Sequence, residues 1–133
     1  MCFIGQEDVE WEELDWGSLG WVIRPANVPD AAHLCCLDVK LQPGMGHDFH
    51  CHPNQEELIF VRSGELEQWI GEERRTISAG DVVFIPKDTV HATFYSADAE
   101  QEARVLVVLG PSYGADGYEA VDRATEEPWC NLR

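Results

Sequence analysis

The chain has 133 residues, of which 44% are hydrophobic and 26% are charged. This composition is typical of a globular domain and excludes the disordered class. The formal net charge of −16 would repel a phosphate backbone or an anionic lipid surface, so we expect neither nucleic acid nor a membrane as a partner.

The first residues carry neither the basic segment nor the long apolar segment of a secretory signal, so we expect a cytoplasmic protein. The five cysteines are an odd number, and the adjacent Cys35 and Cys36 would point to opposite faces of a strand. This pattern predicts reduced thiols that behave as small buried hydrophobes rather than a disulfide framework.

Short apolar segments separated by Gly, Pro, Asn and Asp predict an all-β protein. We expect strands at 21–23, 34–41, 47–51, 57–62, 65–70, 74–77, 82–85, 92–95, 105–109 and 118–122. Their even spacing is typical of a sandwich or barrel, and the glycine turns between several of them predict antiparallel neighbours. Without an internal repeat or a linker, we expect one domain over residues 1–133.

Apolar and charged residues alternate strictly at the end of the segment 34–41. The alternation places Leu37, Val39 and Leu41 in the core, while Asp38 and Lys40 are expected to face water.

Large aromatic residues mark both ends of the chain. They are Trp11, Trp16 and Trp21 near the N-terminus, and Tyr113, Tyr118 and Trp129 near the C-terminus. Such side chains seldom remain in water, so both arms are expected to pack on the sheets or on a second subunit. We predict a homodimer whose contact includes the N-terminal arm, and the alternative is that the arms cover their own sheets.

The candidate chemistry begins in the segment 44–57. Residues two apart share one face of a strand, so His50 and His52 present their imidazoles in parallel. After the turn-prone Pro53-Asn54 pair, an antiparallel strand can return a carboxylate to the same place. Glu57 fits better than Glu56, because apolar residues of the following strand share its face and would form a dry wall.

A third imidazole comes from His91, which is preceded by an apolar segment and begins the strand predicted at 92–95. Three imidazoles and one carboxylate suit a single divalent transition-metal ion, which would be Fe, Mn, Co, Ni, Cu or Zn. The sequence therefore predicts a metal site formed by His50, His52, Glu57 and His91.

The same residues resemble the two motifs of the cupin superfamily. The first motif is met at every defined position, by Gly44, His50, His52, Glu57 and Gly64.

The second motif is met by Gly80, Pro86 and His91. It differs at Asp88, where the pattern has Gly, and at Tyr95, where it has Asn. A turn tolerates Asp at the first position, whereas Tyr changes the polar lining at the second.

The resemblance covers residues 44–95 and implies a jelly-roll β-barrel that carries the metal ligands. It also implies a small-molecule ligand or substrate, and dioxygenase, decarboxylase, lyase and isomerase reactions all remain open. We expect a metal-dependent enzyme that acts on a small polar organic molecule. The alternative is a non-catalytic cupin that binds a small molecule or a sugar.

Tyr95 and Gln68 are the candidate catalytic residues beyond the ligands. Tyr95 and Thr93 share the parity of His91, so Tyr95 either donates a proton in the pocket or only packs there. Gln68 alternates with apolar residues expected to point inward, and it points inward unless the strand is turned to place Trp69 there instead.

His47 and Cys51 differ in parity from the ligands and are expected to face away from them. His47 is therefore predicted to lie at the surface or behind the ligands, and Cys51 in a core.

Overall fold

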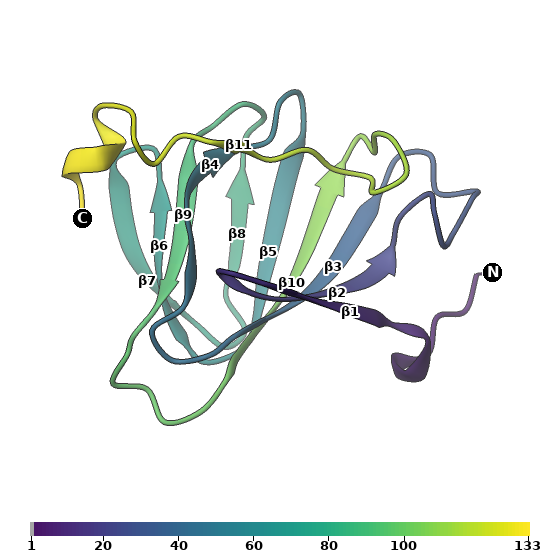
Figure 1. Ribbon diagram of the computed structural model, residues 1–133, viewed down its shortest axis with the longest axis horizontal. Coiled ribbons are helices and arrows are strands. Elements are labelled where there is room, and N and C mark those ends of the chain that lie inside the picture. The colour runs from purple at the N-terminus through teal and green to yellow at the C-terminus, as the bar shows by residue number, and fades with distance from the viewer. Residues whose placement is uncertain (1) are drawn as a thin grey trace.

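The computed structural model describes residues 2–133, so Met1 of the predicted domain lies outside the described residues. Strands dominate the structure, and they form two antiparallel sheets that enclose the main core (Figure 1). The first sheet has the strand order β1 (Glu10–Leu14), β2 (Gly17–Ile23), β3 (Cys35–Leu41), β10 (Ala103–Gly110), β5 (Glu56–Ser63) and β8 (Val82–Ile85).

The second sheet has the strand order β11 (Val121–Asp122), β4 (Gly46–Cys51), β9 (His91–Tyr95), β6 (Glu65–Ile70) and β7 (Glu73–Ser78). Two short 3-10 helices lie near the ends of the chain, η1 (Gln6–Asp8) and η2 (Trp129–Asn131). In the described part of the chain, neither helix has the length or hydrophobicity needed to cross a bilayer.

The predicted all-β class is confirmed, and every expected strand overlaps an observed one. The two sheets are hydrogen-bonded as separate sheets, so closure into a barrel is not confirmed. Strand β1 was not expected, because its Glu-Trp-Glu-Glu-Leu sequence is mostly exposed and gives only a weak strand pattern.

Alternation within the strands fills the space between the sheets with apolar side chains. In β10, Ala103, Val105, Val107 and Leu109 are buried, and the residues between them are half-buried. Burying one face of each sheet in this way fixes the register, because a slip of one residue would turn the apolar set outward.

The expectation for Asp38 was wrong. Its side chain lies on the outer face of the first sheet, opposite the core residues, but it is only 5% exposed. Arg62 contacts its carboxylate at 3.2 Å, and the Arg104 Nε atom donates a hydrogen bond to it at 3.0 Å. Both arginines lie on strands distant in sequence, so alternation within β3 could not reveal that they cover Asp38.

The C-terminal arm covers the outer face of the second sheet. Phe49 of β4 is buried there between Trp69 and Trp129, with ring centroids 5.7 Å from each. The yellow end of the chain lies beside this sheet in Figure 1. This second apolar cluster explains why β4 is buried on both faces.

The three N-terminal tryptophans all contact the chain's own sheets. The Trp11 ring lies 3.8 Å from the Lys40 ammonium, Trp16 stacks on His47, and Trp21 belongs to the core between the sheets. These contacts agree with an arm that covers its own sheet, and they leave the dimer untested.

Substitution of Gly64 tests the close packing of the turn between β5 and β6. Its φ is +94°, and a Cβ atom there would lie 2.6 Å from the Ala103 Cβ atom. We expect Gly64→Ala to lower the free energy of unfolding by about 2–4 kcal/mol, from backbone strain and overpacking together. Gly71 also has positive φ but open space around it, so Gly71→Ala should cost only about 1 kcal/mol. Equal losses in urea denaturation would contradict the close approach at Gly64.

Candidate metal centre

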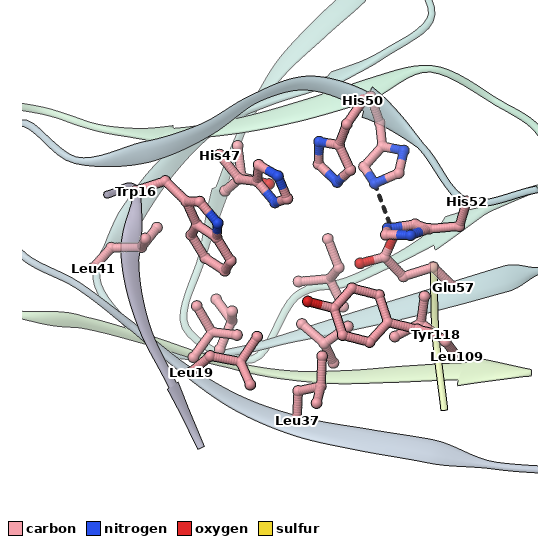
Figure 2. Close-up of a pocket in the computed structure, with 16 residues that line it drawn as sticks. Trp16, Leu19, Leu37, Leu41, His47, His50, His52, Glu57, Leu109 and Tyr118 are labelled. Carbon is pink, nitrogen blue, oxygen red and sulfur yellow. Dashed lines mark ion pairs between the residues drawn. The ribbon is translucent and has the colours of Figure 1, made fainter. Parts of the chain in front are cut away.

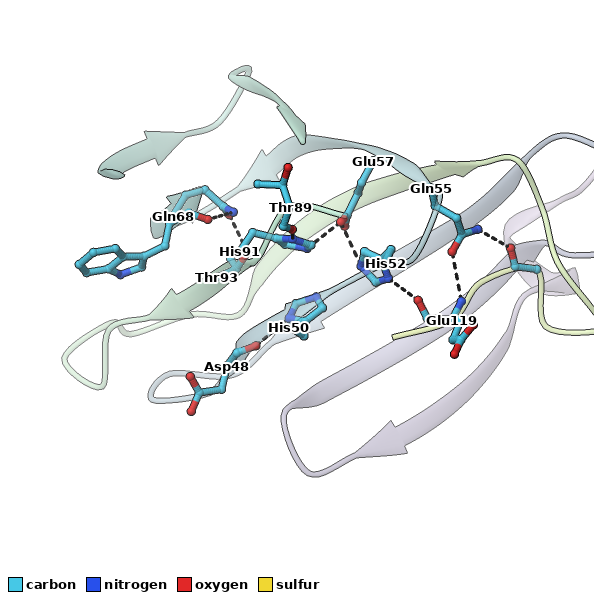
Figure 3. Close-up of polar contacts among 12 residues, drawn as sticks. Asp48, His50, His52, Gln55, Glu57, Gln68, Thr89, His91, Thr93 and Glu119 are labelled. Carbon is cyan, nitrogen blue, oxygen red and sulfur yellow. Dashed lines mark hydrogen bonds and ion pairs between the residues drawn. The ribbon is translucent and has the colours of Figure 1, made fainter. Parts of the chain in front are cut away.

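The candidate site lies where the chain passes from one sheet to the other. His50 of β4 is directly opposite His91 of β9 in the second sheet. His52 follows the end of β4, and Glu57 lies near the start of β5 in the first sheet. The short connection 52–55 therefore brings ligands from both sheets to one end of the sandwich (Figure 3).

The three imidazoles converge. One ring nitrogen from each of His50, His52 and His91 lies within 4.8 Å of the others, and all three residues are buried. The His50 ring centroid is 4.2 Å from that of His91 and 5.0 Å from that of His52. These separations are compatible with three nitrogen ligands on one ion. The predicted parallel arrangement of His50 and His52 was wrong, because His52 lies past the end of β4 and its ring is inclined by 80° to that of His50.

Backbone carbonyls fix the orientation of each ring. The Nδ1 atoms of His50, His52 and His91 lie 2.6, 2.7 and 2.9 Å from the carbonyl oxygens of Asp48, Glu119 and Thr89, respectively. A carbonyl can only accept, so Nδ1 carries the proton and the Nε2 lone pair is available to an ion.

Glu57 completes the cluster, whereas Glu56 is exposed, as the alternation predicted. The Glu57 Oε2 atom lies 3.1 Å from His52 Nε2 and 2.8 Å from His91 Nε2. Within residues 2–133, neither Glu57 Oε2 nor His91 Nε2 has a hydrogen-bond partner of good geometry, although both atoms are buried. Poorly directed polar atoms that crowd together in a buried site fit a position for a cation between them.

The charges of the cluster are strongly coupled. Burial opposes ionisation of Glu57, but the adjacent imidazoles of His91 and His52 hold the pKa of its carboxyl well below the ordinary value. Burial also opposes the charged form of His91, yet the Glu57 carboxylate raises its pKa. Burial, together with the charge on His91, lowers the pKa of His50 well below its ordinary value. Glu57 and His91 therefore stabilise each other's charged forms against the cost of burial.

Gln55 positions His52 and was missed by the sequence analysis. Its amide donates to the carbonyls of Pro111 and Gly117, and its Oε1 accepts a hydrogen bond from the Glu119 backbone N–H at 3.1 Å. The Glu119 carbonyl in turn holds the His52 ring. Because these partners are more than 50 positions away in the chain, no local pattern could have revealed them.

The expectation that His47 faces away from the ligands was wrong. The pairing of β4 with β9 shifts register between His47 and His50, and this irregularity returns His47 to the ligand face. Its ring stacks on His50 with centroids 3.5 Å apart, and Trp16 stacks on its other side at 4.3 Å. Burial lowers the pKa of His47 to about 4.

Gln68 and Tyr95 both lie buried between the sheets, while Trp69 packs on the outer face. Thr93, rather than either of them, contributes to the wall of the pocket beside the histidines. The Thr93 hydroxyl donates a hydrogen bond of 2.6 Å to Gln68 Oε1, which links Gln68 to the pocket indirectly. Catalytic roles for Gln68 and Tyr95 stay predictions.

Asp88 adopts the backbone conformation for which the cupin pattern has Gly. Its φ is +62°, and its Oδ1 atom accepts a hydrogen bond from the Asn54 backbone N–H at 2.7 Å. This contact joins the turn before His91 to the turn after His52, so the departure from the pattern leaves the ligand loops connected.

The ligands occupy one end of a cavity of about 50 Å³, lined by sixteen residues (Figure 2). A water molecule needs roughly 10–15 Å³ of such space, so the cavity holds a few waters beside the ligands. Trp16 and Tyr118 also line it, and neither was expected to do so. Burial raises the pKa of Tyr118 to about 12, so its hydroxyl stays protonated at neutral pH.

Relatives were found among both curated proteins and solved structures. Protein SchB of Streptomyces halstedii is 32% identical over 71 residues, which are 53% of this chain and 50% of SchB. The chain thus spans about half the length of that relative.

Two solved structures illustrate the likeness of fold. The polyketide cyclase RemF of Streptomyces resistomycificus has a TM-score of 0.73 at 18% identity, covering 97% of this chain and 90% of RemF. Oxalate decarboxylase of Lactobacillus farciminis has a TM-score of 0.73 at 22% identity, covering 87% of this chain and 34% of the enzyme.

The family itself follows from the sequence match. Residues 37–109, more than half of the chain, match the model of the Cupin domain family. The matched segment contains the three converging histidines and Glu57. The chain therefore belongs to the cupin family.

Proposed function

We propose that His50, His52, Glu57 and His91 bind one divalent transition-metal ion and that the chain is a metal-dependent enzyme acting on a small organic molecule. The observation that carries this proposal is the common orientation of the three imidazoles. Each has its Nδ1 atom on a backbone carbonyl, which leaves its Nε2 atom for the shared centre beside Glu57. Rings that only filled a core would not need three such anchors directed at a single point.

The bound ion would supply Lewis acidity toward an oxygen-bearing group of the substrate. The chain's own residues orient the ligands, exclude bulk water with an apolar wall and keep the Tyr118 hydroxyl protonated beside the site. Dioxygenase, decarboxylase, lyase and isomerase chemistry all remain compatible with this donor set. RemF and oxalate decarboxylase, both named as enzymes, support an enzymatic role but do not select a reaction.

We also propose that residues 1–133 act as one domain and that the protein is cytoplasmic. All five cysteines are free thiols, as a reducing compartment would keep them.

The ligand set is tested by metal content. Purified protein should carry about one ion per chain, because one group of four ligands is present. His50→Ala and His91→Ala should each reduce this to near zero, while the exposed His33→Ala should not change it. Folding is checked by circular dichroism and metal by elemental analysis. Full metal content in both folded ligand variants would show that the ion binds elsewhere.

The role of Glu57 as a metal ligand is tested with a substitution that keeps the shape of its side chain. Glu57→Gln removes the buried negative charge and should weaken Zn²⁺ binding by ~100-fold or more, beyond the usual effect of a residue that only orients a ligand. Glu56 is exposed one position away, so Glu56→Gln should bind Zn²⁺ like the unmodified chain. Competition with a chromophoric chelator measures both affinities. If the two variants lose equal affinity, Glu57 is not a ligand.

We further propose a homodimer, and the exposed apolar strip on β5 and β8 supports it. Leu58 and Phe60 of β5 are directly opposite Phe84 and Val82 of β8. These side chains are 38%, 37%, 57% and 58% exposed, respectively. A contiguous apolar patch of this kind often marks an interaction site.

A second copy of the chain is the partner that the charges favour for this strip. The protein carries a net charge of −16, so two copies repel each other over most of their surface. Beside the strip, Arg62 and Arg104 both contact Asp38, and the exposed Glu56 lies on the same face of β5 as Leu58. The two arginines balance these two carboxylates, so two copies repel each other less beside the strip than their net charge of −16 implies.

The role of the strip in dimer formation is tested by measuring the mass of the protein in solution. Light scattering at micromolar concentration should give twice the chain mass for the unmodified protein and the monomer mass for Phe84→Lys, because a buried lysine would face the apolar partner. Thr125→Lys adds the same charge at an exposed position of the C-terminal arm and should leave the dimer intact. A monomeric unmodified protein would refute the dimer.

A further inference from the structure

The wall of the pocket facing the ligands is almost entirely apolar. Eight aliphatic side chains line it from β2, β3, β5 and β10, and two aromatic side chains, Trp16 and Tyr118, complete it. Figure 2 shows Leu19 and Leu37 across the cavity from the histidines. A molecule in this pocket therefore meets polar groups mainly at the end of the pocket where the proposed metal ligands lie.

The pocket has little capacity for negative charge. Among residues 2–133, its lining includes neither Lys nor Arg. A divalent ion with three neutral imidazoles and the Glu57 carboxylate would leave a single net positive charge. One carboxylate or enolate would neutralise that charge, whereas a dianion such as oxalate would leave a buried negative charge without a partner.

The pocket is also poorly equipped for a sugar. The Thr93 hydroxyl already donates to Gln68, so its proton is not available to a ligand. Of the lining residues other than the proposed ligands, Tyr118 offers one hydroxyl, which points into the cavity in Figure 2, Trp16 one indole N–H, and His47 its ring nitrogens. A polyhydroxylated molecule would bury several hydroxyl groups against leucine and valine without hydrogen bonds.

The size of the pocket points to Trp16 as its movable part. A cavity that holds benzene measures about 150 Å³, whereas this one measures about 50 Å³. Trp16 is half-buried in the turn between β1 and β2, and the aliphatic wall residues lie within strands. Its ring is parallel to that of His47, with an interplanar angle of 5°. A flat ligand could take the same stacking position if the turn moved outward.

We propose that the pocket binds a flat, largely apolar molecule with at most one negative charge, its polar end toward His50 and Glu57, and that Trp16 moves to admit it. This proposal rests on the proposed function and narrows its substrate class, since the sequence alone favoured a small polar molecule. Under this proposal, neither oxalate nor a sugar is the substrate of this chain.

The experiment compares three probes by titration calorimetry on the full chain, after Zn²⁺ binding has been measured separately. The probes are 2-naphthoate, a flat monoanion; glucuronate, a polar monoanion; and oxalate, a small dianion. We expect 2-naphthoate to bind at least ~10-fold more tightly than the other two, as apolar complementarity commonly provides. Equal or tighter binding of oxalate or glucuronate would overturn the proposal.

Two pairs of variants locate the binding. Val107 lines the pocket and Val108 lies on the opposite face of β10. Val107→Thr should weaken 2-naphthoate several-fold, and Val108→Thr should not. Trp16→Ala should strengthen it by enlarging the entrance, whereas Trp11→Ala, on the outer face, should have no effect. Equal effects within either pair would refute the assigned wall or entrance.

Failure of this proposal can be distinguished from failure of the metal site. If the chain binds Zn²⁺ but prefers oxalate, the metal site stands and the substrate class is wrong. If the chain binds no Zn²⁺, the proposed function fails, and the wall is still tested because the metal-free chain should prefer 2-naphthoate to glucuronate. Loss of that preference in the metal-free chain would overturn the apolar assignment.

Discussion

A carboxylate buried between two apolar sheets is the constraint on which the rest of the site depends. Glu57 is only 5% exposed, and its charge can persist there only with compensating groups close by. His91 of the opposite sheet and His52 of the connection between β4 and β5 approach it at 2.8 and 3.1 Å, respectively. The pairing of β4 with β9 and the short connection from β4 to β5 both serve to bring these groups together. The interactions of the Glu57 carboxylate with the two histidines thus hold the sheets together at this end of the sandwich.

Backbone geometry, rather than further side chains, orients the histidines. The three carbonyls that accept from their Nδ1 atoms come from Asp48, Thr89 and Glu119. The first two precede their histidines by two residues, so the local backbone supplies them. The third belongs to the C-terminal segment and is held by Gln55. The C-terminal part of the chain is therefore needed for the site, although it contains none of the four proposed ligands.

The outer faces of the two sheets differ in how far other parts of the chain cover them, and this difference bears on assembly. The C-terminal arm covers the second sheet through Trp129, which packs on Phe49. The first sheet has a buried ion pair at Asp38 but leaves Phe84 more than half exposed. Among the described residues, β5 and β8 carry the exposed apolar strip, which is why the proposed dimer contact is placed there.

The sequence by itself determined the strand class, the opposite faces of Glu56 and Glu57, and the turns marked by glycine, because side-chain alternation and positive φ are local properties of the backbone. It also pointed to the family through motif spacing. Only the tertiary structure decided that His47 joins the ligand face, that Asp38 is buried and that Gln55 supports His52. A register shift depends on the partner strand, and burial depends on side chains that arrive from distant positions. The apolar wall is likewise assembled from strands far apart in sequence, so no local pattern contains it.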